Sequence, residues 1–170
     1  RFLQLCSNDN MQVLNCTTPA NYFHALRRQM HRDFRKPLVI MTPKSLLRHK
    51  NCVSDLEDFS KKNTFHRVLW DHAIDPKTKG FIKLKKPNEI KKVILCSGKI
   101  YFDLIEAREK LKRNDVIFFR IEQLYPFPVK SLVKETKPYA KRAKFYWCQE
   151  EPKNMGAWFS VRDYIQWTLD

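Results

Sequence analysis

Residues 93–121, with the sequence VILCSGKIYFDLIEAREKLKRNDVIFFRI, decide the fold class. The two apolar runs, VILC at 93–96 and VIFFRI at 116–121, are typical of strands that are buried on both faces of a parallel sheet. Residues 100–111, between them, are predicted to form a helix. A strand, a helix and a second strand in this order predict a βαβ unit with parallel strands.

The same alternation continues toward the C-terminus. We expect a helix at about residues 129–136, a strand at 145–148 and a last helix at about 156–169, in which Trp158, Val161 and Ile165 share one side. Strands that alternate with helices at such intervals indicate an α/β fold, built from βαβ units around a parallel sheet.

The N-terminal part repeats the pattern. Apolar runs at residues 11–16 (MQVLNC) and 38–41 (LVIM) predict strands. Thr18-Pro19 between them is an N-cap followed by proline at the first helical position, so a helix is expected to begin there. Its apolar side chains fall three or four residues apart and predict a stripe that faces the core: Phe23, Leu26, Met30 and Phe34.

Thr42-Pro43 repeats the cap-and-proline signal and predicts a second helix at residues 44–48. If the strands at 11–16 and 38–41 are neighbours, both helix starts lie at the carboxyl edge of the sheet. Residues 51–88 lose this periodicity and are predicted to be an irregular connection with one strand at most.

Lysine and arginine outnumber aspartate and glutamate by 33 to 18, which gives a formal net charge of +15. Much of the excess lies in two clusters, Arg27, Arg28, Arg32, Arg35, Lys36, Lys44, Arg48 and Lys50 in the first and Lys77, Lys79, Lys83, Lys85, Lys86, Lys91 and Lys92 in the second. This charge raises nucleic acid or an acidic partner as a candidate ligand. The alternative is that acidic segments of a longer chain balance it.

Cysteine and histidine spacing predicts no metal site and no disulfide framework. The five cysteines are an odd number without a C-x-x-C pair, and the five histidines lack the spacing of zinc ligands. Cys16, Cys96 and Cys148 lie in or beside apolar runs and are expected to be small buried side chains. No run approaches the roughly 20 apolar residues that span a bilayer, so we expect a soluble protein.

Two short segments could take part in binding. Ser97-Gly98-Lys99 follows a strand and opens a helix, and is either a tight turn or an anion site, because P-loop spacing is absent. Glu150 and Glu151 follow another strand, but adjacent extended residues point in opposite directions and cannot act as one acid–base pair. One of them is expected to cap or pair structurally.

Six strings in order resemble the decarboxylating component of 2-oxoglutarate dehydrogenase complexes, a family of transketolase-like thiamine diphosphate enzymes. They are RFLQLC at 1–6, TTPANYFHALRR at 17–28, MTPKSLLRHK at 41–50, LCSGK at 95–99, IEQLYPFP at 121–128 and WCQEEPKNMGAW at 147–158. Residues 66–92 depart from the pattern. The chain starts at Arg1 without an initiator Met and stops at Asp170 within a helical pattern, so both ends are expected to be cut. The resemblance implies that the chain is a carboxy-terminal fragment of such a component.

The resemblance implies two domains. Residues 1–48 are similar to the tail of a pyrimidine-binding domain, and 49–170 to a carboxy-terminal α/β domain, with 49–90 as the irregular connection. The implied activity is a step of the tricarboxylic acid cycle: conversion of 2-oxoglutarate to CO2 and a succinyl group, which passes to the lipoyl arm of the dihydrolipoyl succinyltransferase core. The family implies homodimers that use thiamine diphosphate and magnesium, in the bacterial cytoplasm or the mitochondrial matrix.

The resemblance places no catalytic, cofactor or metal residue on this chain, because the family's cofactor-activating glutamate and substrate-binding histidines match positions upstream of Arg1. The fragment alone is therefore expected to be inactive. Some members bind an acyl-CoA or an adenine nucleotide near this domain. The corresponding basic residues form the predicted allosteric anion site: Arg27, Arg28, Lys44 and Arg48.

The competing hypothesis is a basic nucleic-acid-binding module. Such a module presents aromatic side chains among its cations on an exposed face. Phe23, Phe34, Phe118 and Phe119 instead fall on apolar stripes that are predicted to face the core. The pattern therefore favours the enzyme module, and nanomolar, salt-dependent affinity for generic DNA or RNA would reverse that ranking.

Overall fold

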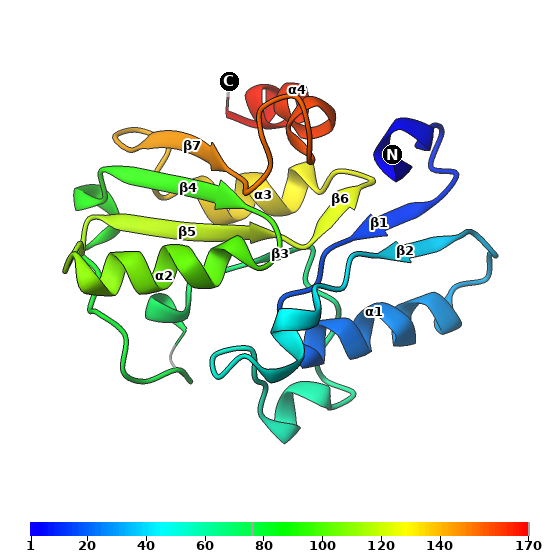
Figure 1. Ribbon diagram of the computed structural model, residues 1–170, viewed down its shortest axis with the longest axis horizontal. Helices are drawn as coiled ribbons and strands as arrows, with labels where there is room; N and C mark the ends of the chain where they lie inside the picture. Colours follow the sequence, from blue (N-terminus) through cyan, green and yellow to red (C-terminus); the bar gives the residue numbers. More distant parts are fainter. Residues whose placement is uncertain (76, 170) are drawn as a thin grey trace.

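The computed structural model of the protein describes residues 1–75 and 77–169 and contains two sheets (Figure 1). The first sheet has the order β2-β1-β6 and the strands β1 (Gln12–Leu14), β2 (Leu38–Ile40) and β6 (Gln123–Tyr125). The second sheet has the order β3-β5-β4-β7 and the strands β3 (Val68–Leu69), β4 (Lys92–Cys96), β5 (Val116–Ile121) and β7 (Lys144–Cys148). The helices are α1 (Pro19–His31), α2 (Ile100–Lys110), α3 (Val129–Thr136) and α4 (Trp158–Leu169).

The predicted parallel pairings are confirmed. β4 runs parallel to β5 on one side and to β7 on the other, and β1 runs parallel to β2. Residues 51–88 contain the two-residue strand β3 and the 3-10 helices η3 (Leu56–Phe59), η4 (His72–Ile74) and η5 (Pro87–Glu89), which agrees with an irregular connection. The chain is therefore α/β, as its alternating pattern predicts.

Sequence patterns did not predict two antiparallel pairings. β3 pairs antiparallel with β5, and β6 pairs antiparallel with β1. The second pairing arises because β5 continues almost directly into β6, with only Glu122 between them. The chain thus passes from one sheet into the other, and this passage joins the two halves of the molecule.

The second sheet is covered on both faces (Figure 1). Phe119 packs in a core with Leu132 of α3 and Val161 of α4. Its neighbour Phe118 points to the other face and packs with Tyr101 of α2. All six residues of β5 are buried, which explains why its sequence is apolar except for Arg120.

The expected core stripe on α1 is wrong. The predicted stripe is instead exposed, with exposed fractions of 41% for Phe23, 45% for Leu26 and 77% for Met30, and Phe34, 42% exposed, lies beyond the end of the helix. The buried face carries Ala20, Asn21, His24 and Ala25. Asn21 and His24 hydrogen-bond to the segment after η2, so polar contacts rather than apolar spacing decide which face of α1 is buried.

The predicted helix at residues 44–48 is a 3-10 helix, η2 (Lys44–Arg48). Pro43 is its N-cap residue, and no side-chain hydrogen bond caps it. The predicted cap by Thr42 is therefore wrong, whereas Thr18 does cap α1, since its side chain accepts a hydrogen bond from the backbone N–H of Asn21. Within the described residues, no helix is long and apolar enough to cross a membrane.

Candidate functional site

The passage between the two sheets carries a fully buried carboxylate, Glu122. It accepts hydrogen bonds from the backbone N–H of Thr17 at 2.9 Å, from Thr17 Oγ1 at 2.5 Å and from Asn21 Nδ2 at 2.9 Å. Burial raises the pKa of Glu122, while the charge of Arg120 and these hydrogen bonds oppose the rise. Because these bonds all come from the chain itself, the carboxylate ties the start of α1 to the second sheet.

Arg120 and Asn21 extend this buried network. The guanidinium of Arg120 donates to Thr17 Oγ1 at 3.0 Å and to the carbonyl of Trp70 at 2.7 Å, and it lies 4.1 Å from the ring centroid of Tyr101. Asn21 donates to the carbonyl of His66 at 3.0 Å and accepts from the same residue's N–H at 2.8 Å. The start of α1, the segment at 66–70 and the end of β5, which are distant in sequence, are thus joined by hydrogen bonds.

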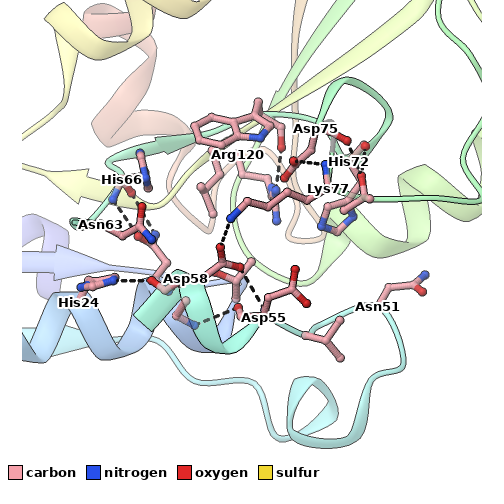
Figure 2. A pocket seen from close by; sticks show the side chains of 18 of the residues that line it. His24, Asn51, Asp55, Asp58, Asn63, His66, His72, Asp75, Lys77 and Arg120 are labelled. Carbon is pink, nitrogen blue, oxygen red and sulfur yellow. Dashed lines mark hydrogen bonds and ion pairs between the residues drawn. The ribbon is translucent and has the colours of Figure 1, made fainter. Parts of the chain in front are cut away.

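A cavity of about 530 Å³ adjoins this network, between α1, Arg120 and the segments at 50–58, 63–75 and 77–81. Figure 2 shows Asp58 between His24 and Lys77 in this cavity. His24 Nε2 lies 2.7 Å from the Asp58 carbonyl, and Lys77 Nζ donates to Asp58 Oδ1 at 2.6 Å. Charges of both signs line the cavity, and one ion pair, between Lys77 and Asp58, lies within it.

His72, on the wall of this cavity, is only 7% exposed. Its ring packs against Phe81 and Tyr101, with a centroid distance of 5.3 Å to each. Burial, and secondarily the charge of Arg120, lowers the pKa of His72 to about 4 from an ordinary value of 6.5. His72 is therefore neutral at physiological pH.

This depressed pKa makes stability depend on pH. As the pH falls below 6.5, the unfolded chain binds the proton before the folded protein does, so the stabilisation present above pH 6.5 is lost as the pH falls through about 4. Between about pH 7 and about pH 5, the free energy of unfolding should fall by roughly 2 kcal/mol from this residue. Denaturant titrations of wild type and of His72→Phe should show this loss only in the wild type.

The exposed His31 provides the control for this experiment. His31→Gln should keep the pH dependence of the wild type. Equal slopes of stability against pH in the wild type and His72→Phe would contradict the assignment.

A second cavity, of about 580 Å³, is lined by basic side chains. Arg32, Lys36, Arg67 and Lys130 border it, and Asp9 is the one acidic residue among the described residues that line it. Burial, together with the positive charge of Arg67, lowers the pKa of Arg32. The cations that meet here repel each other, which favours an anionic ligand.

Two of the four residues of the predicted anion site have hydrogen-bond partners within the chain. Arg27 turns toward the loop after η3 and donates to the carbonyls of Ser60 and Asn63. Arg28 is half-buried and bonds instead to Gln123 Oε1 at 2.9 Å and Gln12 Oε1 at 2.8 Å. The remaining pair, Lys44 and Arg48, is exposed on η2. No contact among the described residues joins the four, and their ligand-binding role stays a prediction.

The sequence analysis did not predict the buried network or the basic cavity, although the sequence contains some signals for them. Arg120 and Glu122 are charged residues at the end of an apolar run, which could have indicated a buried network. Arg32 and Lys36 belong to the first basic cluster, but Arg67 and Lys130 are distant in sequence. Only the fold brings these cations to one cavity.

The turn at Ser97-Gly98-Lys99 is confirmed as a tight turn. Gly98 has φ of +77°, and a Cβ at this position would lie 2.4 Å from Asn15 Nδ2, so both backbone conformation and space favour glycine. Lys99 pairs with Glu150, which confirms that one of the two adjacent glutamates has a structural partner. An anion site at this turn would have to compete with that carboxylate.

Cysteine placement agrees with the sequence analysis. All five cysteines are free; Cys16 and Cys96 are buried, while Cys148 is partly buried. Burial raises the pKa of the Cys16 and Cys96 thiols far above the range of a reactive thiolate. In the described part of the chain, no group of three His, Cys, Asp or Glu side chains is placed to hold a metal ion.

Comparison with known proteins assigns both parts of the chain. The family model described as 2-oxoglutarate dehydrogenase C-terminal matches residues 53–170. The chain belongs to this family. The model of the transketolase pyrimidine binding domain matches residues 1–50, in keeping with the parallel β1–α1–β2 unit and a transketolase-like fold.

Similar proteins carry the same family name. The chain is 60% identical over 169 residues to the 2-oxoglutarate dehydrogenase E1 component of Brucella abortus (strain S19), and 59% identical to those of Brucella ovis and Brucella canis. Each match covers 99% of this chain and 17% of the relative. The chain therefore spans about a sixth of the length of these E1 components.

Proposed function

We propose that this chain is the carboxy-terminal part of the decarboxylating component of a 2-oxoglutarate dehydrogenase complex. The observation that carries the proposal is 60% identity, over nearly the whole chain, to a protein named as the E1 component. The full-length enzyme would convert 2-oxoglutarate to CO2 and a succinyl group, and pass that group to the lipoyl arm of the succinyltransferase core. We place the domain division near residue 48, in keeping with the two matched ranges.

Thiamine diphosphate and magnesium would be held by residues outside this chain. The buried carboxylate most suited to activate a cofactor is Glu122, but its hydrogen bonds go to Thr17 and Asn21. It is therefore a structural group, and the chain contributes no catalytic side chain to the proposal. The full-length enzyme would be a homodimer, located in the bacterial cytoplasm or the mitochondrial matrix.

The test of this proposal is CO2 release by the full-length polypeptide that contains this chain. With thiamine diphosphate and magnesium, it should release CO2 from 2-oxoglutarate and transfer the succinyl group to a lipoylated succinyltransferase. Pyruvate is the control substrate and should give little product. Preference for pyruvate, or equal activity without the cofactor, would contradict the assignment.

A second function, binding of an anionic effector such as an acyl-CoA or adenine nucleotide, is favoured by the basic cavity at Arg32 and Arg67. The predicted site at Arg27, Arg28, Lys44 and Arg48 is the alternative location. Replacing two cations that bind a phosphate should weaken effector activation about tenfold or more, because each charge-assisted hydrogen bond contributes roughly 1.5–3 kcal/mol.

Two double variants of the full-length enzyme distinguish the locations. Arg32→Ala with Arg67→Ala tests the cavity, and Lys44→Ala with Arg48→Ala tests η2. The measurement is the effector concentration for half-maximal activation, with turnover in the absence of effector unchanged. If neither double variant alters activation, the effector does not bind through these cations.

A further inference from the structure

We propose that the amino edge of the second sheet is a docking surface for an acidic protein segment. The surface is defined by Lys85, Lys91, Lys92, Lys112, Lys141 and Lys144, all exposed. It lies at the ends of β4, β5 and β7 opposite their arrowheads (Figure 1), whereas the Ser97-Gly98-Lys99 turn and Glu150 lie at the carboxyl edge. This proposal goes beyond the function proposed above.

Main-chain contacts bring these lysines together from four segments of the chain. The backbone N–H of Lys85 donates to the carbonyl of Asn114 at 2.9 Å, and that of Lys91 donates to the carbonyl of Asp115 at 2.9 Å. The backbone N–H of Lys144 in turn donates to the carbonyl of Lys91 at 2.9 Å. The cations therefore belong to one continuous edge, which the sequence shows only as separate lysines.

Like charges face each other on this edge. Lys92 of β4 and Lys144 of β7 are register partners on neighbouring strands, and Lys91 directly precedes Lys92. Like charges in opposed positions destabilise a sheet. None of these three lysines forms an ion pair within the described residues. An anionic partner would remove this repulsion.

The nearby carboxylates offset only part of the charge of the edge, Asp115 being the one that interacts with Lys91. Asp115 is mostly buried and pairs with Arg113 at 2.8 Å. Glu109 receives the backbone N–H of Ile82 and a guanidinium N–H of Arg108. Glu89 is exposed in η5 but is one carboxylate against six lysines. The edge thus keeps a strong positive charge, which attracts an acidic surface over a Debye length of about 8 Å at physiological salt.

The chemistry of the edge favours an acidic protein over other polyanions. A single-stranded nucleic acid needs aromatic platforms for its bases. On the described residues of β4, β5 and β7, the exposed aromatic side chain is Tyr146, and Lys92 Nζ lies 5.5 Å from its ring centroid. A membrane surface needs an apolar face to insert, and Leu111 is a single exposed apolar side chain beside Lys112. A single exposed aromatic ring on these strands and a single exposed apolar side chain beside Lys112 give little for bases or acyl chains to contact, so the edge favours carboxylates, which lysines contact as point charges.

The test is binding of a fluorescently labelled oligo-glutamate peptide to the full-length protein, measured by fluorescence anisotropy. An oligo-glutamine peptide of the same length is the control ligand. The variant Lys91→Glu/Lys92→Glu/Lys144→Glu should bind the oligo-glutamate at least about tenfold more weakly than wild type, with a smaller salt dependence. Lys61→Glu/Lys62→Glu/Lys153→Glu, which makes the same change in net charge at exposed sites elsewhere, should bind nearly as wild type.

Thermal unfolding checks that each variant is folded, and Lys91→Gln/Lys92→Gln/Lys144→Gln replaces the reversed variant if that one does not fold. Equal loss of affinity in both charge-reversed variants would overturn the proposal, because net charge alone would then explain binding. Tighter binding of duplex DNA or of phosphatidylserine vesicles than of oligo-glutamate, abolished by the edge variant, would also overturn it in favour of those partners. Unchanged affinity in the edge variant would rule out the surface.

Discussion

Replacing Asp71 with alanine is expected to lower the free energy of unfolding by about 3–5 kcal/mol, because the change leaves the buried charge of Arg108 without its partner. The two side chains are 0% and 1% exposed. The guanidinium of Arg108 contacts both carboxylate oxygens of Asp71, at 2.5 and 3.1 Å. Asp71 also accepts hydrogen bonds from the backbone N–H groups of Ala73 and Phe118, which would lose their partners too.

Urea unfolding followed by circular dichroism measures this effect. The control is Glu106→Ala, which removes the exposed pair of Glu106 with Lys110 on the surface of α2. An exposed pair is worth roughly 0–1 kcal/mol, so the control should hardly change stability. A loss below about 1 kcal/mol for Asp71→Ala would show that Arg108 finds another partner or water.

Glu122→Ala should also destabilise the protein by about 3–5 kcal/mol. The change leaves the N–H and hydroxyl of Thr17 without this acceptor and removes one of the two acceptors of the Asn21 amide, and each unsatisfied buried group costs roughly 1–3 kcal/mol. It also removes a buried carboxylate that interacts with the buried charge of Arg120. Because these contacts join α1 to the second sheet, their loss should loosen the connection between the two sheets.

Hydrogen exchange and urea unfolding together test this expectation. Glu122→Ala should speed amide exchange at the start of α1 and in the loop at 63–67, as well as shift the unfolding midpoint. Glu150→Ala is the matched control, because Glu150 pairs with Lys99 at the surface. Wild-type exchange around Thr17 and Asn21 in the Glu122 variant would show that the carboxylate does not hold this junction.

The helices and strands that periodicity predicted best are those of the second sheet. β5 and α3 have the predicted bounds, and β4, α2 and β7 differ from them by one residue at one end. These elements have apolar runs or regular helical spacing because they are buried on both faces or pack on a sheet. Because the residues that are buried are also the apolar ones, the apolar pattern in the sequence indicates these helices and strands well.

The orientation of α1 could not be predicted in this way. Its most apolar face is exposed, and its buried face contains Asn21 and His24, whose partners lie 34 to 101 residues away. Helical periodicity gives no information on such distant polar contacts. The same limit applies to the short edge strands β3 and β6, which form through pairing with β5 and β1 rather than through their own pattern.

The candidate sites, like the helices and strands, were only partly predictable from the sequence. The basic clusters in the sequence indicated where cations are dense. The cavity at Arg32 and Arg67 and the edge at Lys92 and Lys144 combine residues that are at least 35 positions apart, so only the folded chain brings them together. Of the four residues of the predicted anion site, Arg27 and Arg28 are adjacent in sequence, yet the fold gives these two different hydrogen-bond partners.

The central claim, that this chain is a non-catalytic module of a thiamine diphosphate enzyme, is tested most directly by isothermal titration of thiamine diphosphate with magnesium. The 170-residue chain, shown to be folded by circular dichroism, is compared with the full-length polypeptide. The account predicts binding by the full-length polypeptide and none by the 170-residue chain. Micromolar binding by the chain alone would contradict it.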